Sequence, residues 1–137
     1  MAISQVTVFI GNQEGRIEKV TEVLKQSSID IISLSLAESV DFGLLRLIVA
    51  NPDEALARLK EAGMTAKRNH VIAVEISNEP GSLHELLTAL REFNIEYMYL
   101  LNASKKASMI MRIKNYEDAE AVLESEGFKV LSETDIF

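Results

Sequence analysis

The segment of this sequence with the clearest chemical capacity is the loop at residues 78–83, which reads Asn-Glu-Pro-Gly-Ser-Leu. Apolar residues at helical spacing follow it, so the loop exposes the first backbone N–H groups of a helix, and these favour an anion such as a carboxylate. Gly81 lets a ligand approach the backbone closely, and Asn78 adds an amide that can donate and accept. A small zwitterion needs this arrangement on one side and an acceptor for its ammonium group on the other.

Residue patterns that would indicate catalysis or metal binding are absent or incomplete. His84-Glu85 begins a zinc-protease pattern, but Thr88 stands where the second histidine belongs. The sequence contains no cysteine, no phosphate-binding glycine motif and no nucleophile flanked by a base. We therefore predict no catalytic residue, no metal and no cofactor, and a protein that is not an enzyme.

The loop belongs to a repeat that covers nearly the whole chain. Residues 12–63 recur as residues 78–127, with Gly15 matching Gly81 and Gly63 matching Gly127. A duplicated unit of about 65 residues is marginally stable alone, because it buries only about 60% of its unfolded surface. The sequence therefore predicts two copies of one module, at residues 1–68 and 69–137, that pack against each other or against a second chain.

Each copy shows the same order of strand and helix patterns. Strands follow from alternation and helices from apolar residues three or four positions apart. A glycine is placed to end the second helix of each copy, at Gly63 and Gly127. The order βαββαβ, twice, predicts an α+β fold of two ferredoxin-like units, each with a four-stranded antiparallel sheet and both helices on one face.

The other face of each predicted sheet is apolar. By strand parity it carries Phe9, Leu44, Ile48, Tyr99, Leu101 and Ile110. An apolar patch of this kind is typical of a partner surface, so we expect the protein to associate with itself.

The composition excludes two classes of partner. The formal net charge of −7 disfavours nucleic acid, which basic surfaces bind. No apolar stretch is long enough to span a bilayer, and residues 1–5 lack the features of a signal peptide. Together with the absence of cysteine, this predicts a cytoplasmic protein that binds neither nucleic acid nor membrane.

Repeat, strand order and loop motif together resemble tandem ACT domains, an amino-acid-binding regulatory module. Residues 78–83 match the family's Asn-x-Pro-Gly-x-Leu loop at every fixed position, whereas the first copy has Glu14 for proline and Ile17 for leucine. The chain is most similar to stand-alone bacterial tandem-ACT proteins, whose first copy carries an Ala-Glu-x-x-Asp-Phe-Gly-x-x-Arg run, here residues 37–46.

The resemblance implies a site for a free amino acid where modules meet. It pairs a loop asparagine of one module with a polar residue that starts the second strand of the other, namely Asn12 with Glu96 and Asn78 with Asp30. Acidic residues there favour a basic or hydrogen-bonding amino acid. The full set of implied ligand residues is Asn12, Gln13, Glu14, Gly15, Arg16, Ile17, Asp30, Asp41, Phe42, Asn78, Glu79, Pro80, Gly81, Ser82, Leu83, Glu96, Tyr97 and Met98.

The resemblance also implies that modules join through their second strands into one eight-stranded sheet. The last strand of copy one and the first of copy two then lie about 29 Å apart. Lys67-Arg68-Asn69, read as the connection between them, reaches only about 11 Å. We therefore expect copy one to pair with copy two of a neighbouring chain, in a homodimer.

Three functions stay open at this point. The leading one is a non-enzymatic sensor that binds an amino acid and regulates another protein, with an enzyme as the candidate partner. The second is a structural or partner-binding module with vestigial loops, which Glu14 favours for copy one. The third is a small ferredoxin-like hydrolase of acyl phosphates, for which Arg16 is the candidate anion-binding residue.

Overall fold

The computed structural model describes residues 3–11, 13–38, 41–103 and 106–136. Two compact units divide the chain. The N-terminal unit comprises residues 4–69, and the C-terminal unit runs from His70 onward and also includes Ile3. No helix in the described ranges has the length and hydrophobicity to cross a bilayer.

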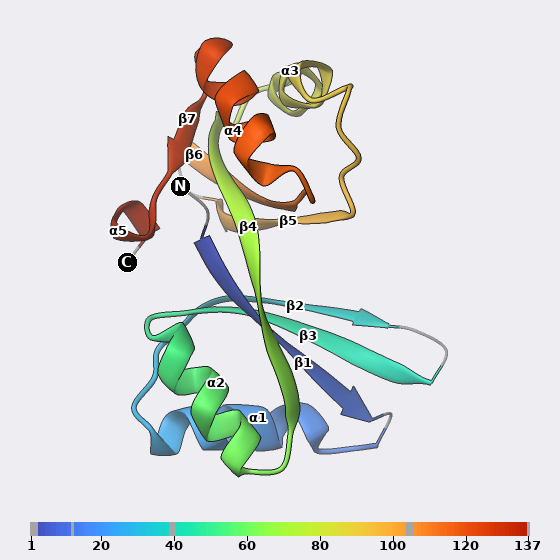
Figure 1. The fold of residues 1–137 in the computed structure, drawn as a ribbon, viewed down its shortest axis with the longest axis vertical. Coiled ribbons are helices and arrows are strands. Elements are labelled where there is room, and N and C mark those ends of the chain that lie inside the picture. Colours follow the sequence, from blue (N-terminus) through green and yellow to red (C-terminus); the bar gives the residue numbers. More distant parts are fainter. Residues whose placement is uncertain (1–2, 12, 39–40, 104–105, 137) are drawn as a thin grey trace. The chain divides into compact units, whose positions relative to one another are not determined.

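The N-terminal unit is a sheet with two helices on one face (Figure 1). Its elements are β1 (Ile3–Gly11), α1 (Arg16–Gln26), β2 (Ile31–Glu38), β3 (Phe42–Val49), α2 (Pro52–Glu61) and the first part of β4 (Thr65–Ser77). The strand order is β2-β3-β1-β4, and β3 is antiparallel to both β1 and β2.

The C-terminal unit repeats this plan. The second part of β4 is followed by α3 (Ser82–Ala89), β5 (Tyr97–Ala103), β6 (Lys106–Arg112), α4 (Tyr116–Ser125), β7 (Lys129–Leu131) and α5 (Glu133–Ile136). The order is β5-β6-β4-β7, with antiparallel pairing throughout. The predicted α+β fold of two ferredoxin-like units is therefore confirmed.

Each unit has its own apolar core between helices and sheet. In the N-terminal unit the core includes Val6 and Val8 of β1, Val20 of α1 and Leu59 of α2, and the C-terminal core repeats these positions. Ile17 and Leu83, which continue the helical spacing, are instead about 40% exposed. Both lie in the first turn of a helix, next to the glycine loop.

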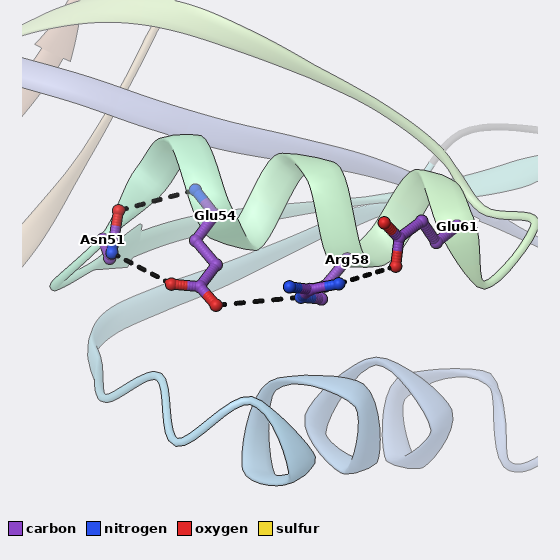
Figure 2. A network of polar contacts seen from close by, with 4 residues as sticks. All are labelled: Asn51, Glu54, Arg58 and Glu61. Carbon is purple, nitrogen blue, oxygen red and sulfur yellow. Dashed lines mark hydrogen bonds and ion pairs between the residues drawn. The ribbon is translucent and has the colours of Figure 1, made fainter.

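The ends of α2 follow the sequence signals. The Asn51 side chain accepts a hydrogen bond from the Glu54 backbone N–H at 3.4 Å and donates to the Glu54 carboxylate at 3.2 Å. Figure 2 shows that these contacts continue through Arg58 to Glu61. A hydrogen bond to Glu61 and the charges of both glutamates raise the pKa of Arg58. Gly63, at φ +83, follows the helix as predicted.

Several boundaries differ from the sequence prediction. Lys67-Arg68-Asn69 lies inside β4 and is not a connection, because no glycine or proline interrupts residues 65–77. The predicted turn at residues 41–43 is shorter, since Phe42 and Gly43 already belong to β3. Lys105, predicted in the equivalent turn, lies outside the described residues, and the short helix α5 was not predicted.

The apolar face opposite the helices is only partly open. Ile48 and Ile110, both predicted to be on that face, are fully buried and lie outside both helix-facing cores. The expectation of an exposed surface is therefore wrong at these two positions.

Candidate functional site

The first glycine loop leads directly into α1. Gly15 caps the helix in the left-handed conformation, with φ +80, and a Cβ at this position would meet nothing within 4 Å. Backbone conformation, and not lack of space, therefore demands glycine here. The turn aims the first N–H groups of α1 outward, and these groups have no acceptor one turn earlier in their own helix.

A pocket of about 890 Å³ opens beside this loop. It forms where the end of β1, the first turn of α1, the end of β2 and the start of β3 converge. All of these segments belong to the N-terminal unit. The lining residues are Ile10, Gly11, Gln13, Glu14, Gly15, Arg16, Ile17, Glu18, Leu36, Ala37, Glu38 and Gly43.

The pocket carries charges of both signs. Its lining includes Glu14, Glu18, Glu38 and the guanidinium of Arg16. A Cβ on Gly11 would lie 3.6 Å from Nε of Arg16, so the guanidinium lies beside the Gly11 backbone. The ion pairs found within the described residues do not include Arg16. This arrangement can hold an anionic group at Arg16 and the helix end, and a cationic group at the glutamates.

Residues of β1, β2 and β3 form the apolar floor of the pocket. A Cβ on Gly43 would lie 3.1 Å from Cγ1 of Ile10 and 3.4 Å from Cδ1 of Leu36. Leu36 is 50% exposed, so its side chain forms a wall of the pocket that faces solvent. Gly43 and its two neighbours therefore give the pocket an apolar floor, and Glu38, the β2 partner of Gly43, lies beside it.

The second glycine loop has the same backbone but different side chains. Gly81 caps α3 with φ +91, and the exposed Asn78, Glu79 and Pro80 precede it. The Ser82 hydroxyl, at the position of Arg16, is 2.7 Å from the Ser77 hydroxyl. Leu83, at the position of Ile17, is 42% exposed. The C-terminal loop is therefore less charged than the N-terminal loop.

The two predicted second-strand carboxylates lie far from the loops of their own units. The Ala50 N–H donates to the Asp30 backbone at 3.0 Å, whereas Phe42, at the other end of β3, pairs with Gly11. The distance along β3 from Phe42 to Ala50 is roughly 26 Å. Glu96 is likewise far from the second loop. Its N–H donates to the Arg112 carbonyl at 2.9 Å, at one end of β6, whereas Lys106, at the other end of β6, pairs with Ser77 beside the loop.

The other predicted ligand residues are distributed between two faces of the sheets. The Phe42 ring contacts Phe9, with ring centroids 5.9 Å apart, on the face opposite the helices, so it points away from the pocket. Asp41 is exposed and does not line the pocket. Met98 packs against the C-terminal core, and Tyr97 is half-buried beside it. Asn12 lies outside the described residues. The ligand roles of all these residues stay predictions.

Seven residues that line the pocket are not among the predicted ligand residues, namely Ile10, Gly11, Glu18, Leu36, Ala37, Glu38 and Gly43. The available signal was Gly43, because a glycine inside a strand often marks a close approach by a ligand or a backbone. Within residues 3–11, 13–38, 41–103 and 106–136, no cluster of three or more potential ligand side chains could hold a metal ion.

Comparison with known proteins places this geometry in a family. The sequence matches the model of the ACT domain pair over residues 1–137. A crystal structure of a protein from Bacteroides thetaiotaomicron is similar, with 33% identity and a TM-score of 0.93 over 99% of this chain and 96% of that one. No curated protein matches the sequence.

Two further structures share the fold. The ligand-free regulatory subunit of aspartate kinase from Thermus thermophilus has 20% identity and a TM-score of 0.66, over 89% of this chain and 91% of that one. The corresponding subunit from Thermus flavus has 21% identity and a TM-score of 0.63, over 88% of each chain. With the family model matching from end to end, the chain belongs to the ACT domain pair family.

Proposed function

We propose that this protein is a non-enzymatic sensor that binds a free amino acid and regulates another protein. The observation that carries the proposal is the pocket of about 890 Å³ at the start of α1, whose lining combines a helix end, Arg16 and carboxylates. An α-amino acid presents the complementary pair of charges, a carboxylate and an ammonium group.

In the proposed complex the amino acid's carboxylate lies at the first turn of α1, where it accepts hydrogen bonds from backbone N–H groups and Arg16. Its ammonium group faces a carboxylate. The pocket's own glutamates supply one such carboxylate, and the pairings Asn12 with Glu96 and Asn78 with Asp30 supply a further one from a second module. Because Asp30 and Glu96 lie roughly 20 Å or more from their own unit's loop, a neighbouring chain is the proposed source.

The proposed assembly is a homodimer that joins β2 of one chain to β5 of another. Within the described residues, β2 and β5 are edge strands that pair only with β3 and β6. Leu34 on β2 and Leu100 on β5 are 51% and 50% exposed. Open backbone groups next to exposed leucines support pairing with another strand.

The proposed regulated partner is an enzyme, and the proposed location is the cytoplasm. Amino-acid binding acts by favouring one arrangement of modules over another, which requires a difference in affinity between the arrangements. A partner that contacts only one arrangement then responds to the amino-acid concentration.

A thermal-shift screen with the twenty amino acids tests ligand binding. A ligand at 100 times its dissociation constant adds about 2.7 kcal/mol to the free energy of unfolding, which raises Tm by several degrees. We expect a rise with one amino acid or a small chemical group of them. A flat response to all twenty contradicts the sensor function.

A second candidate is a partner-binding module that has lost its ligand. Glu14, in place of the family's proline, and the exposed Leu34 and Leu36 favour this reading for the N-terminal unit. It predicts the flat thermal response together with intact self-association, so the same screen combined with light scattering separates the two candidates.

A further inference from the structure

At the strand position that faces Ile10, the N-terminal pocket lacks a methyl group that the C-terminal unit has at the same place. Gly43 is the direct strand partner of Ile10, and Ala107 is the direct strand partner of Ile76. Ile10 and Ile76 hold the same position in the two copies, since each directly precedes the last residue of its strand before the glycine loop. Ala107 is therefore the counterpart of Gly43, and both residues are buried.

Gly43 has no conformational need to be glycine. It lies in regular strand β3 and is not one of the glycines with positive φ. Glycine inside a strand costs stability, because it loses more chain entropy on folding and packs no side chain. The constraint on this position is space, since a methyl group there would lie 3.1 Å from Cγ1 of Ile10 and would force that side chain to move.

We propose that Gly43 sets the size of the ligand side chain that the N-terminal pocket accepts. This inference rests on the proposed function and names the class of ligand. The amino acid's carboxylate is held at the start of α1, and an aliphatic stem runs over Gly43 between Ile10 and Leu36. The N-terminal pocket therefore selects amino acids with long aliphatic stems, and the methyl group of Ala107 leaves less room in the C-terminal unit.

Titration calorimetry with unbranched amino acids tests the inference. The probes are glycine, alanine, 2-aminobutyrate, norvaline and norleucine. In the unmodified protein we expect affinity to rise along the series, by about fourfold per methylene group. In Gly43→Ala we expect norleucine to bind about 10-fold or more weakly, because one methyl group in an apolar pocket discriminates on that scale. Glycine and alanine should bind as before.

Ser35→Thr is the matched control, because it adds one methyl group to β2 on the opposite face of the sheet, beside Arg46. It should leave the chain-length dependence unchanged. If Gly43→Ala weakens all five probes equally, Gly43 has only a structural role and the inference is overturned. A series without a chain-length gradient in the unmodified protein overturns it as well. If no amino acid of any kind binds, the proposed function itself fails first.

Discussion

Arg16 is a pocket residue at which the two copies differ in charge. Among the described residues that line the N-terminal pocket it is the single basic one, and Ser82 stands at its position in the C-terminal unit. Its guanidinium lies next to the Gly11 backbone, at the end of the helix that the proposed carboxylate approaches. The planar guanidinium group can donate two parallel hydrogen bonds to a carboxylate at this point, which a serine hydroxyl cannot do.

Arg16→Ser should therefore weaken amino-acid binding by about 10-fold or more, because a hydrogen bond between charged groups contributes about 1.5–3 kcal/mol. Since Arg16 is exposed, stability without ligand should change by less than about 0.5 kcal/mol. Titration calorimetry and chemical denaturation measure the two effects. Arg91→Ser, an exposed arginine of the C-terminal unit, is the control. Unchanged affinity in Arg16→Ser would remove this residue from the site.

The two copies differ in how the N-terminus of their second helix is capped, which should affect the stability of each helix. Asn51 and Asn115 precede the second helix of their copies, and both are natural N-cap residues. The side chain of Asn51 accepts from the Glu54 N–H, whereas that of Asn115 makes no capping bond in the structure. Asn115 is thus an internal control for Asn51.

Asn51→Ala should lower the free energy of unfolding by about 1 kcal/mol, within the usual range of 0.5–2 kcal/mol for a lost N-cap. Asn115→Ala should cost clearly less, because no side-chain capping bond is lost. Urea unfolding monitored by circular dichroism compares the two variants. An equal cost for both would show that the Asn51 bond contributes nothing measurable.

The short helix α5 carries a titratable cap. The Asp135 carboxylate accepts from the Ser132 N–H at 2.8 Å and from its hydroxyl at 3.0 Å. These bonds, the backbone one first, lower the pKa of Asp135. Because the pKa is lower in the folded chain, the contribution is present above the unfolded value of about 3.9 and is lost as pH falls through the folded value.

An NMR titration should therefore give Asp135 a midpoint below 3.9 and below that of Asp135 in Ser132→Ala, which lacks the hydroxyl donor. As pH falls through that midpoint, the amide resonances of residues 133–136 should shift together with the carboxyl signal. A midpoint at the unperturbed value, or one that Ser132→Ala does not move, would show that the cap is not formed in solution.

At the level of elements, most helices and strands that occur in both copies could be predicted from the sequence. Most features that occur only once in the chain could not. Alternation such as Val6-x-Val8-x-Ile10 recurs in both copies, so each copy supports the reading of the other. The continuity of β4 was missed because the polar residues 67–69 resemble a turn in sequence. The short α5 offers too few residues for a helical period.

The candidate site also has a part that the sequence could predict and a part that it could not. The glycine loops could be predicted, because Gly15 and Gly81 meet a local requirement for positive φ. The pocket floor could not, because Gly43 reaches Ile10 only through the register of β1 and β3, which is a tertiary property. A ligand role for Asp30 and Glu96 is even harder to predict from sequence, since a partner module must bring them to a loop.

For the whole molecule, the central question is which edge strands pair in the proposed homodimer. Pairing of β2 with β5 of the neighbouring chain uses both Leu34 and Leu100, whereas pairing of β2 with β2 uses only Leu34. The two arrangements place different carboxylates at each loop, so they also predict different ligand sites. The two leucines therefore separate the arrangements by mutation alone.

Leu34→Lys and Leu100→Lys should each convert the dimer to a monomer in light scattering. A lysine at either position removes apolar contact and places an ammonium group at the joined edges, which disfavours strand pairing. Each variant should also weaken amino-acid binding, because the partner's carboxylate is lost from the site. Ser125→Lys, which adds the same charge on the exposed side of α4, should remain dimeric. A monomer caused by Leu34→Lys alone would indicate pairing of β2 with β2, and a monomeric unmodified protein that binds its amino acid would exclude both arrangements.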